Sequence, residues 1–334
     1  MSIGKSGASK PLKMVTCGRC KSRSFIPADL APFATTPCSK CEHPVMLPVM
    51  LRNFQLQTII ASGGMGTVYT AQDVKLQRQV ALKMMKREMA ADPAILKGFY
   101  REARASASLN HTNIIHIYSF DEFDGQPYLV MELADQGSLD SRIEAAGRVP
   151  ELDVLDVGIK MCSALATALQ HKLLHRDIKP GNILFNTEGE PKLIDFGLVR
   201  AAEDDTWEEH IWGTVYYVAP EKLERKGEDF HSDMYSLGGT LYHALTGHVP
   251  FEGSVDEVVS AHVHTALTPP NLVAPDITEL TSHALLCAMA KHPSERFESY
   301  DDFRMALEAA RSQLLIGQVR QAGQTDPGKS WWRR

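Results

Sequence analysis

The chain has 334 residues, of which 44% are hydrophobic and 23% charged, and its formal net charge is −6. These values are typical of a soluble globular protein of about two domains, and they exclude a wholly disordered, collagen-like or coiled-coil chain. No apolar run approaches the about 18 residues that a membrane-spanning helix needs, and the N-terminus lacks the apolar segment of a secretory signal. We therefore expect a cytoplasmic protein without a transmembrane segment.

Basic residues gather at the two ends of the chain. Residues 1–50 hold seven Lys or Arg and two Asp or Glu, and residues 316–334 hold four and one. Their net charges of +5 and +3 leave −14 on residues 51–315, because the whole chain is −6. An acidic body with short basic ends is not typical of a nucleic-acid-binding protein, so we do not expect nucleic acid as a partner.

A small N-terminal module and two loose ends flank one large domain. Residues 1–13 are rich in Gly, Ser and Lys, and residues 316–334 are polar, so we expect a flexible N-terminus and a flexible basic tail. Residues 14–48 carry four of the six cysteines together with prolines and no helical period, which predicts loops and short strands. Residues 53–315 are long enough to bury a large core.

Within the large domain the hydrophobic pattern changes from strands to helices. A strand over 79–84 has a period of two, which places Ala81, Lys83 and Met85 on one face. The later elements that the pattern predicts are a helix over 93–109, strands over 114–120 and 127–133, and helices from residue 138 onward, the clearest over 152–173. We therefore expect an α+β fold of two lobes, strand-rich over 53–133 and helical over 134–315.

The four N-terminal cysteines have the spacing of a metal site. Cys17-x2-Cys20 and Cys38-x2-Cys41 are separated by seventeen residues. Each Cys-x-x-Cys turn directs two thiolates at one ion, and two such turns complete a tetrahedral four-sulfur shell. The pattern resembles the zinc ribbons and predicts structural Zn²⁺, which would stabilise a module too small to fold on its own.

Several alternatives for this module remain open. Iron in a rubredoxin-like site is the chief rival to zinc, followed by a thiol redox pair. The module would act as a structural element or as a docking site for a partner, a nucleic acid or a regulator, and its signature does not choose among these. Arg19, Lys21 and Lys40 would offset the negative charge of the four thiolates. His43 is a fifth candidate ligand, but because four cysteines already fill the shell we interpret it as a surface residue.

A glycine-rich segment lies between two predicted strands. It contains Gly63, Gly64 and Gly66, and glycines let a backbone approach phosphate groups closely. Lys83 follows on the next strand, and Glu102 on the helix 93–109 is a candidate partner for its ammonium group. Alone, these features are weak evidence because glycine-rich turns are common.

A more specific constellation occupies residues 175–182, His-Arg-Asp-Ile-Lys-Pro-Gly-Asn. It places the carboxylate of Asp177, the ammonium of Lys179 and the amide of Asn182 within six residues, and Asp195-Phe196-Gly197 follows. Asp177 is suited to accept a hydroxyl proton, and Asn182 and Asp195 offer the hard oxygen ligands that Mg²⁺ prefers. Phosphoryl transfer needs this combination of positioning and charge neutralisation.

The ordered set of motifs resembles the eukaryotic-type (Hanks-type) serine/threonine protein kinases, most closely the bacterial members. The resemblance covers about residues 53–315. It includes the glycine-rich loop, Val80-Ala81-Leu82-Lys83, Arg101-Glu102-Ala103, the segment 175–182, Asp195-Phe196-Gly197 and Ala219-Pro220-Glu221. It implies the two-lobed protein kinase fold, with ATP and Mg²⁺ (or Mn²⁺ in its place) as cofactors and proteins as substrates.

The resemblance also implies roles for individual residues. Asp177 would be the catalytic base, Lys179 would steady the γ-phosphate, and Lys83 would hold the α- and β-phosphates and pair with Glu102. Asn182 and Asp195 would bind Mg²⁺, and Glu221 would form a buried ion pair with Arg296. The residues implied in nucleotide binding are Ala61, Gly63, Gly64 and Gly66 at the phosphates, Val68 and Ala81 at the adenine, Met131 as gatekeeper, and the backbone from Glu132 to Ala134 at the hinge.

Four features bear on the subclass and on the alternatives. Lys179 and Gly213-Thr214 match the serine/threonine class rather than the tyrosine class. Gly213-Thr214 and Ala219-Pro220-Glu221, which the family uses to seat peptide, disfavour a small-molecule kinase. Ala61 departs from the usual first glycine of the loop. It is the one feature that favours the alternative, a nucleotide-binding pseudokinase or scaffold whose zinc ribbon mediates partner binding.

Regulation is predicted on the segment between Asp195 and Thr214. Thr206 is its only hydroxyl-bearing residue, and related kinases carry an activating phosphothreonine at this distance from the end of the segment. We predict that Thr206 is autophosphorylated and that the phosphate docks on Arg176. The rival interpretation is that one of the neighbouring carboxylates supplies the negative charge permanently: Glu203, Asp204, Asp205, Glu208 or Glu209.

Overall fold

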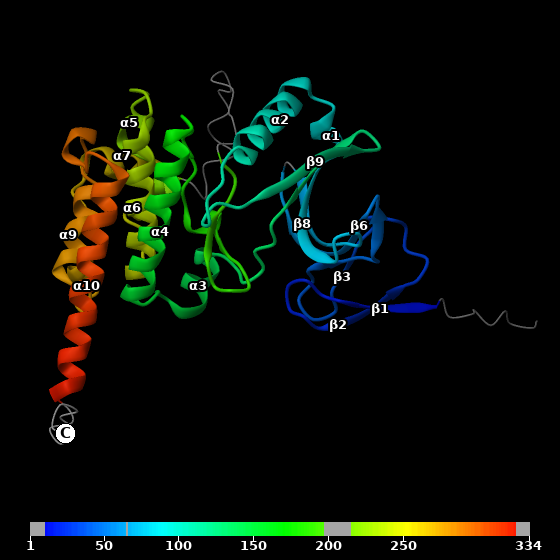
Figure 1. The fold of residues 1–334 in the computed structure, drawn as a ribbon, viewed down its shortest axis with the longest axis horizontal. Coiled ribbons are helices and arrows are strands. Elements are labelled where there is room, and N and C mark those ends of the chain that lie inside the picture. Colours follow the sequence, from blue (N-terminus) through cyan, green and yellow to red (C-terminus); the bar gives the residue numbers. More distant parts are fainter. Residues whose placement is uncertain (1–10, 65, 197–214, 325–334) are drawn as a thin grey trace, which may run out of the picture. The chain divides into compact units, whose positions relative to one another are not determined.

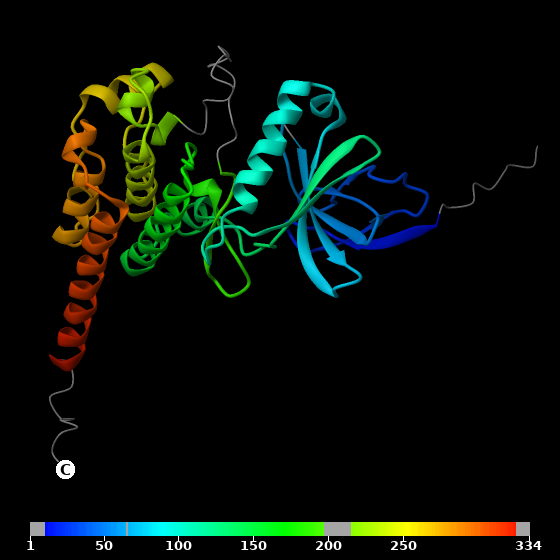
Figure 2. The same cartoon turned by 45° about the horizontal axis from the view of Figure 1, so that its top comes forward.

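The computed structural model describes residues 11–64, 66–196 and 215–324, and the chain forms two compact units (Figure 1). The first unit comprises residues 1–103 and 116–133, and the second comprises residues 104–115 and 134–334. Strands dominate the first unit and helices the second, as a view turned by 45° also shows (Figure 2). The predicted two-lobed α+β layout is confirmed.

The N-terminal module consists of two small antiparallel hairpins. Its strands are β1 (Leu12–Thr16), β2 (Arg23–Pro27), β3 (Thr36–Pro37) and β4 (Pro44–Val45). Cys17 and Cys20 lie in the turn after β1, and Cys38 and Cys41 lie in the turn after β3. Ile26 and Val45 are the buried apolar side chains that pack with Cys17 and Cys38. Because this apolar core is small, much of the module's stability would come from an ion bound by the cysteines.

A six-stranded antiparallel sheet forms most of the first unit, in the order β5-β6-β7-β8-β10-β9. The strands are β5 (Val49–Leu51), β6 (Phe54–Ser62), β7 (Gly66–Asp73), β8 (Arg78–Met85), β9 (Ile117–Phe123) and β10 (Gln126–Met131). Consecutive strands in the chain are neighbours except that β8 pairs with β10, because the short helix α1 (Arg87–Ala90) and α2 (Pro93–Ala107) intervene before β9.

The two faces of β8 pack against different partners, as its period of two predicts. Val80, Leu82 and Met84 belong to the core of the curled sheet, which also includes the fully buried Met46 from the end of the cysteine module. On the opposite face, Met85 packs with Phe99 of α2. The alternation of side chains along a strand therefore fixes which face meets the helix and leaves Lys83 on the helix face.

Helices build the second unit. They are α3 (Leu139–Ala146), α4 (Glu151–Gln170), α5 (Pro220–Leu223), α6 (Phe230–Thr246), α7 (Val255–His264), α8 (Pro270–Val273), α9 (Glu279–Ala288) and α10 (Tyr300–Gln324). Helix α6 begins where the side chain of Asp229 accepts a hydrogen bond from the His231 backbone, and it ends at Gly247 in the left-handed conformation. Leu155 and Leu165 of α4 pack in the same core as Phe303 of α10.

Two features of the second unit differ from the sequence prediction. A short hairpin, β11 (Ile183–Phe185) and β12 (Pro191–Leu193), interrupts the helices, and its turn is closed by Asn186, whose side chain accepts two backbone hydrogen bonds. Helix α10 continues to Gln324, so the first part of the expected loose tail over 316–334 is helical. No helix within the described ranges, α10 included, is long and apolar enough to cross a membrane.

Candidate active site

The glycine-rich turn closes the β6–β7 hairpin in the first unit. The backbone N–H of Gly63 donates to the carbonyl of Gly66 at 2.9 Å. A Cβ on Gly66 would lie 2.4 Å from the carbonyl oxygen of Met84, so only glycine fits there beside β8. Ala61 pairs with Val68 just after a shift in the strand register, it is not among the residues with positive φ, and it is exposed. An alanine at this position is therefore accommodated without strain.

The strand register gathers the other predicted nucleotide-binding residues of the first unit. Lys83 of β8 lies opposite Val68 of β7 and Leu129 of β10, and Ala81 lies opposite Met131. Glu102 lies on α2. Glu132 continues from β10, and its backbone N–H donates to the carbonyl of His116 at 2.8 Å. Ala134 is buried and is the first residue of the segment 134–334, which belongs to the second unit.

In the second unit, Asp177 is the centre of a polar cluster. The ammonium of Lys179 lies 2.9 Å from one carboxylate oxygen of Asp177. The side-chain amide of Asn182 donates to that same oxygen at 2.9 Å and to the Asp177 carbonyl at 2.7 Å. Because the amide nitrogen of Asn182 is engaged with Asp177, the amide oxygen is the atom that it can offer to a cation.

The backbone of this loop is fastened to α6 by a buried carboxylate. Asp233 is 3% exposed and accepts hydrogen bonds from the backbone N–H groups of His175 at 2.6 Å and Arg176 at 2.7 Å. Burial raises the pKa of Asp233 above its ordinary value, although the two N–H donors stabilise its ionised form. The chain passes through Arg176 with φ of 67°, which turns Asp177 away from the preceding segment.

Asp195 is held close to the same loop by its neighbours. The backbone N–H of Ile194 donates to the carbonyl of Asn182 at 3.0 Å, and the imidazole Nε2 of His175 donates to the carbonyl of Ile194 at 2.8 Å. The buried ring of Phe196 packs edge-on against His175, with ring centroids 4.9 Å apart. Asp195 itself has φ of 56°. The structure thus places Asp177, Asn182 and Asp195 on adjoining, hydrogen-bonded segments.

Arg176 lies beside a carboxylate that the sequence did not indicate. Its Nε is 3.7 Å from Glu228, and the ammonium of Lys222 is 3.6 Å from the same carboxylate. Lys222 also donates to the Arg176 carbonyl at 3.0 Å. Glu228 was missed because it lies 52 positions from Arg176, and only the folded chain brings the two together. Thr206, its acidic neighbours and Gly213-Thr214 lie outside the described residues.

The predicted buried ion pair between Glu221 and Arg296 is confirmed. Two parallel hydrogen bonds of 2.8 Å join the carboxylate to the guanidinium, whose side chain is fully buried. Ser232 donates a third bond to Glu221 at 2.7 Å, and Arg296 also donates to the carbonyls of His231 and Ala290. Every strong polar group of the pair is thus engaged, which is the condition under which buried charges are tolerated.

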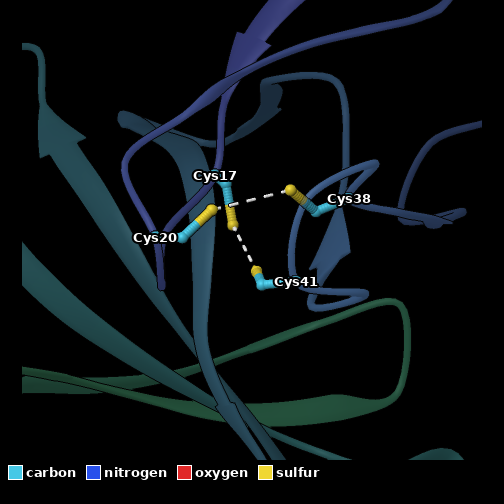
Figure 3. Close-up of side chains that lie close together, drawn as sticks. All are labelled: Cys17, Cys20, Cys38 and Cys41. Atoms are coloured by element: carbon cyan, nitrogen blue, oxygen red, sulfur yellow. Dashed lines mark hydrogen bonds between the residues drawn. The ribbon is translucent and has the colours of Figure 1, made fainter.

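The four N-terminal cysteines converge as predicted (Figure 3). All four sulfur atoms lie within 4.8 Å of one another, and Cys17–Cys41 and Cys20–Cys38 are each 3.7 Å apart. This separation matches the edge of a tetrahedron with metal–sulfur bonds of about 2.3 Å, which is about 3.8 Å, and it is far longer than a disulfide bond. The donor set therefore fits a tetrahedral thiophilic ion.

Local hydrogen bonds prepare this cluster to ionise. The hydroxyls of Ser22 and Ser24 lie 3.5 Å from the sulfur of Cys38 and lower its pKa to about 5. The His43 backbone N–H favours the thiolate of Cys41, but burial and the other cysteines raise its pKa to about 11. A bound cation would compensate the mutual repulsion of the thiolates.

His43 is not the surface residue that the sequence suggested. It is half-buried, it does not belong to the four-sulfur cluster, and its Nε2 donates to the carbonyl of Ile59 in β6 at 2.9 Å. The sequence placed it correctly outside the metal shell. It gave no sign of this bond, because Ile59 lies sixteen residues away in a different element.

Comparison with known proteins identifies the family. The protein kinase domain matches residues 54–300, which is most of the chain, so the chain belongs to the protein kinase family. The match begins after the cysteine module.

Bacterial serine/threonine kinases are among its relatives. The chain is 38% identical over 274 residues to the serine/threonine-protein kinase PknL of Mycobacterium tuberculosis, covering 80% of this chain and 68% of PknL. It is 34% identical to PrkC of Bacillus subtilis, covering 77% of this chain and 40% of PrkC, and 34% identical to PknB of Mycobacterium leprae, covering 78% and 43%. The chain thus spans less than half the length of several curated relatives.

A solved structure confirms the fold. The kinase domain of Mycobacterium tuberculosis PknI superposes with a TM-score of 0.61 and 26% sequence identity, covering 80% of this chain and 99% of that domain. The predicted protein kinase fold, with a strand-rich and a helical lobe, is therefore established for this chain.

Proposed function

We propose that the chain is a serine/threonine protein kinase that transfers the γ-phosphoryl group of Mg-ATP to a protein hydroxyl. The observation that carries the proposal is the cluster of Asp177, Lys179 and Asn182 on a loop fixed by the buried Asp233. Family membership and the printed names of the relatives support it. Lys179 supports the serine/threonine class rather than the tyrosine class.

In this proposal Asp177 acts on the substrate hydroxyl. Its carboxylate accepts the hydroxyl proton while the hydroxyl oxygen bonds to the γ-phosphorus, and the bond from that phosphorus to the β-phosphate oxygen breaks, so that ADP leaves. Lys179 lies close enough to Asp177 to neutralise charge on the transferred group. Asn182 and Asp195 would hold Mg²⁺, or Mn²⁺ in its place, which when bound neutralises phosphate charge.

The first unit would supply the nucleotide site. The glycines of the β6–β7 turn leave room for phosphates, because Gly63 and Gly64 have no atom within 4 Å of where a Cβ would lie. Lys83 would hold the α- and β-phosphates and pair with Glu102. Val68, Ala81 and Met131, which the register sets on neighbouring strands, would contact the adenine, with the backbone of Glu132 to Ala134 as the hinge.

The proposal is tested by mass spectrometry of the whole protein. The purified chain, incubated with Mg-ATP and a generic basic protein, is expected to add phosphate to that protein and to itself, and EDTA is expected to stop both reactions. If neither protein gains phosphate, even with Mn²⁺ in place of Mg²⁺, the enzymatic proposal is wrong and the nucleotide-binding scaffold takes its place.

Regulation by Thr206 is part of the proposal. A phosphate on Thr206 would compete with Glu228 for Arg176 and Lys222, since a dianionic phosphate attracts an arginine more strongly than one carboxylate does. Thr206→Ala is therefore expected to lower activity toward the basic protein several-fold, as initial rates would measure. The double variant Thr206→Ala with Glu228→Gln shows whether the carboxylate of Glu228, which lies beside Arg176 and Lys222, contributes to the remaining activity. Undiminished activity in Thr206→Ala would show that a carboxylate supplies the charge instead.

We also propose that the cysteine cluster binds one structural Zn²⁺. The sulfur separations, and the hydroxyls that lower the pKa of Cys38, support a site for thiolate ligands, and they fit iron equally well. Metal analysis of the purified protein distinguishes the two. Partner docking through this module stays a prediction.

A further inference from the structure

Two residues of the N-terminal module lie against one short stretch of β6: Gly18 in the first Cys-x-x-Cys turn and His43 just after the second. We call residues 17–20 the first knuckle and residues 38–41 the second knuckle. In the first, a Cβ on Gly18 would lie 2.5 Å from the carbonyl oxygen of Ile59 and 3.3 Å from the hydroxyl of Thr58. Directly after the second, His43 donates its hydrogen bond to that same Ile59 carbonyl. Gly18 and His43 thus both lie against the carbonyl group of Ile59.

The contacted stretch is where β6 departs from regular pairing. The register with β7 shifts between Leu56 and Thr58 and again between Ile59 and Ala61. Between the shifts, the backbone N–H of Thr58 donates to the hydroxyl of Thr70 at 3.2 Å instead of continuing the regular ladder. A bulge leaves backbone groups outside the regular ladder and bends the strand, and the contacts of the module fall on this irregular part of β6.

Further contacts extend the interface to β7 and the sheet core. Phe33 of the module packs edge-on against Tyr69 of β7, with ring centroids 6.5 Å apart. Met46, 1% exposed, lies in the same cluster as Ile59 and Tyr69. Tyr69 is adjacent to Val68, and Ile59 lies two residues before Ala61, about 7 Å along the strand. The module therefore contacts both strands that carry the glycine-rich turn.

We infer that the metal-loaded cysteine module is a positioning element for the nucleotide-binding hairpin, acting through Gly18 and His43 on the backbone of Ile59. The inference rests on the proposed function and adds a role for the module within it. A tetrahedral ion would hold the two knuckles at a fixed separation. It would thereby hold Gly18 and the adjoining His43 in place against Ile59. Loss of the ion would release them, so that metal binding and nucleotide binding are coupled.

Coupling of this kind is reciprocal. If the metal strengthens nucleotide binding by some factor, the nucleotide must strengthen metal retention by the same factor. A module that only adds stability, without acting on the hairpin, would raise the melting temperature and leave both affinities independent. The decisive measurement is therefore whether the metal changes the affinity for the nucleotide and the nucleotide changes the affinity for the metal.

The test uses the full chain and Mg-ADP as the probe. Calorimetric titration is expected to show weaker ADP binding in His43→Ala, by at most about ten-fold, the limit set by one hydrogen bond, with the metal content unchanged. His43→Gln retains an N–H donor and is expected to recover part of the affinity. Gly18→Ala, which forces a Cβ against Ile59, is expected to weaken binding as well. Ser39→Ala, an exposed change inside the second knuckle, is the matched control and is expected to bind ADP normally.

Hydrogen exchange and chelator competition complete the test. His43→Ala and metal-stripped protein are expected to exchange amides 58–62 faster than wild type, and saturating ADP is expected to slow metal loss to a chelator in wild type but not in His43→Ala. Unchanged exchange at 58–62 together with ADP-independent metal affinity would overturn the inference. If wild type binds no ADP at all, the proposed function fails, while the exchange of residues 58–62 still decides whether the module positions β6.

Discussion

Replacing Asp177 by asparagine is expected to reduce the turnover of phosphoryl transfer by about 10²–10⁴-fold, the contribution typical of a positioned general base. The amide cannot accept the hydroxyl proton, and it presents an N–H donor to neighbours that are themselves donors, Lys179 and the amide of Asn182. Steady-state rates on a basic protein substrate measure the effect. The affinity for ADP is expected to change little, because the predicted contacts of the adenine and the α- and β-phosphates lie on other residues.

Asp276→Asn provides the matched control for this change. Asp276 is an exposed carboxylate of the same unit, and it pairs with Arg148 on the surface. Losing such a pair costs little, so turnover is expected to match wild type. Retention of near-normal turnover by Asp177→Asn would contradict the role of Asp177 as base, even if the chain proves to be a kinase.

Replacing Arg296 by methionine is expected to destabilise the helical unit by about 3–5 kcal/mol, because it leaves the charge of Glu221 buried without its partner. The loss is large since Arg296 also satisfies the carbonyls of His231 and Ala290. Urea unfolding followed by circular dichroism measures it. Arg304→Met removes a half-buried arginine that pairs at the surface with Asp301 and Glu308, and its expected cost is about 1 kcal/mol or less.

A second substitution separates the lost ion pair from lost packing. Combining Arg296→Met with Glu221→Leu removes both charges, so the double variant is expected to be more stable than Arg296→Met alone. If the double variant is instead less stable by the sum of both single effects, the two side chains act independently and the pairing argument fails.

Acid should reduce the difference between wild type and Arg296→Met. Burial opposes ionisation of Glu221, but hydrogen bonds from Arg296 and Ser232 outweigh it and lower the pKa of the carboxyl. A lowered pKa in the folded protein contributes stability above the ordinary pKa of glutamate, and that contribution is lost as the pH falls through the folded value. The gap between the two proteins is therefore expected to be widest near neutral pH and to narrow below about pH 4.5.

The sequence predicted those parts of the site whose residues are close together in the chain. The cluster of Asp177, Lys179 and Asn182 spans six residues, and the two Cys-x-x-Cys turns each bring two thiols together locally, so motif spacing was sufficient. The alternation in the strand 79–84 likewise predicted that Ala81, Lys83 and Met85 share one face.

Residues that act through distant contacts could not be predicted in this way. Glu228 reaches Arg176, and His43 reaches Ile59, only after the chain has folded, and neither position has a periodic or motif signal. The β11–β12 hairpin was missed because its strands are three residues long, too short for alternation to stand out among helices. The helical end of α10 was missed because its polar composition resembles that of a loose tail.

His175 has a consequence for attempts to transplant this loop into another scaffold. Its backbone N–H is anchored on Asp233, its imidazole holds the carbonyl before Asp195, and its ring packs on Phe196. His175 therefore helps to position both acidic residues, Asp177 and Asp195, relative to each other. A graft of residues 175–182 alone would lose these contacts. Such a graft must therefore also carry Asp233 and residues 194–196.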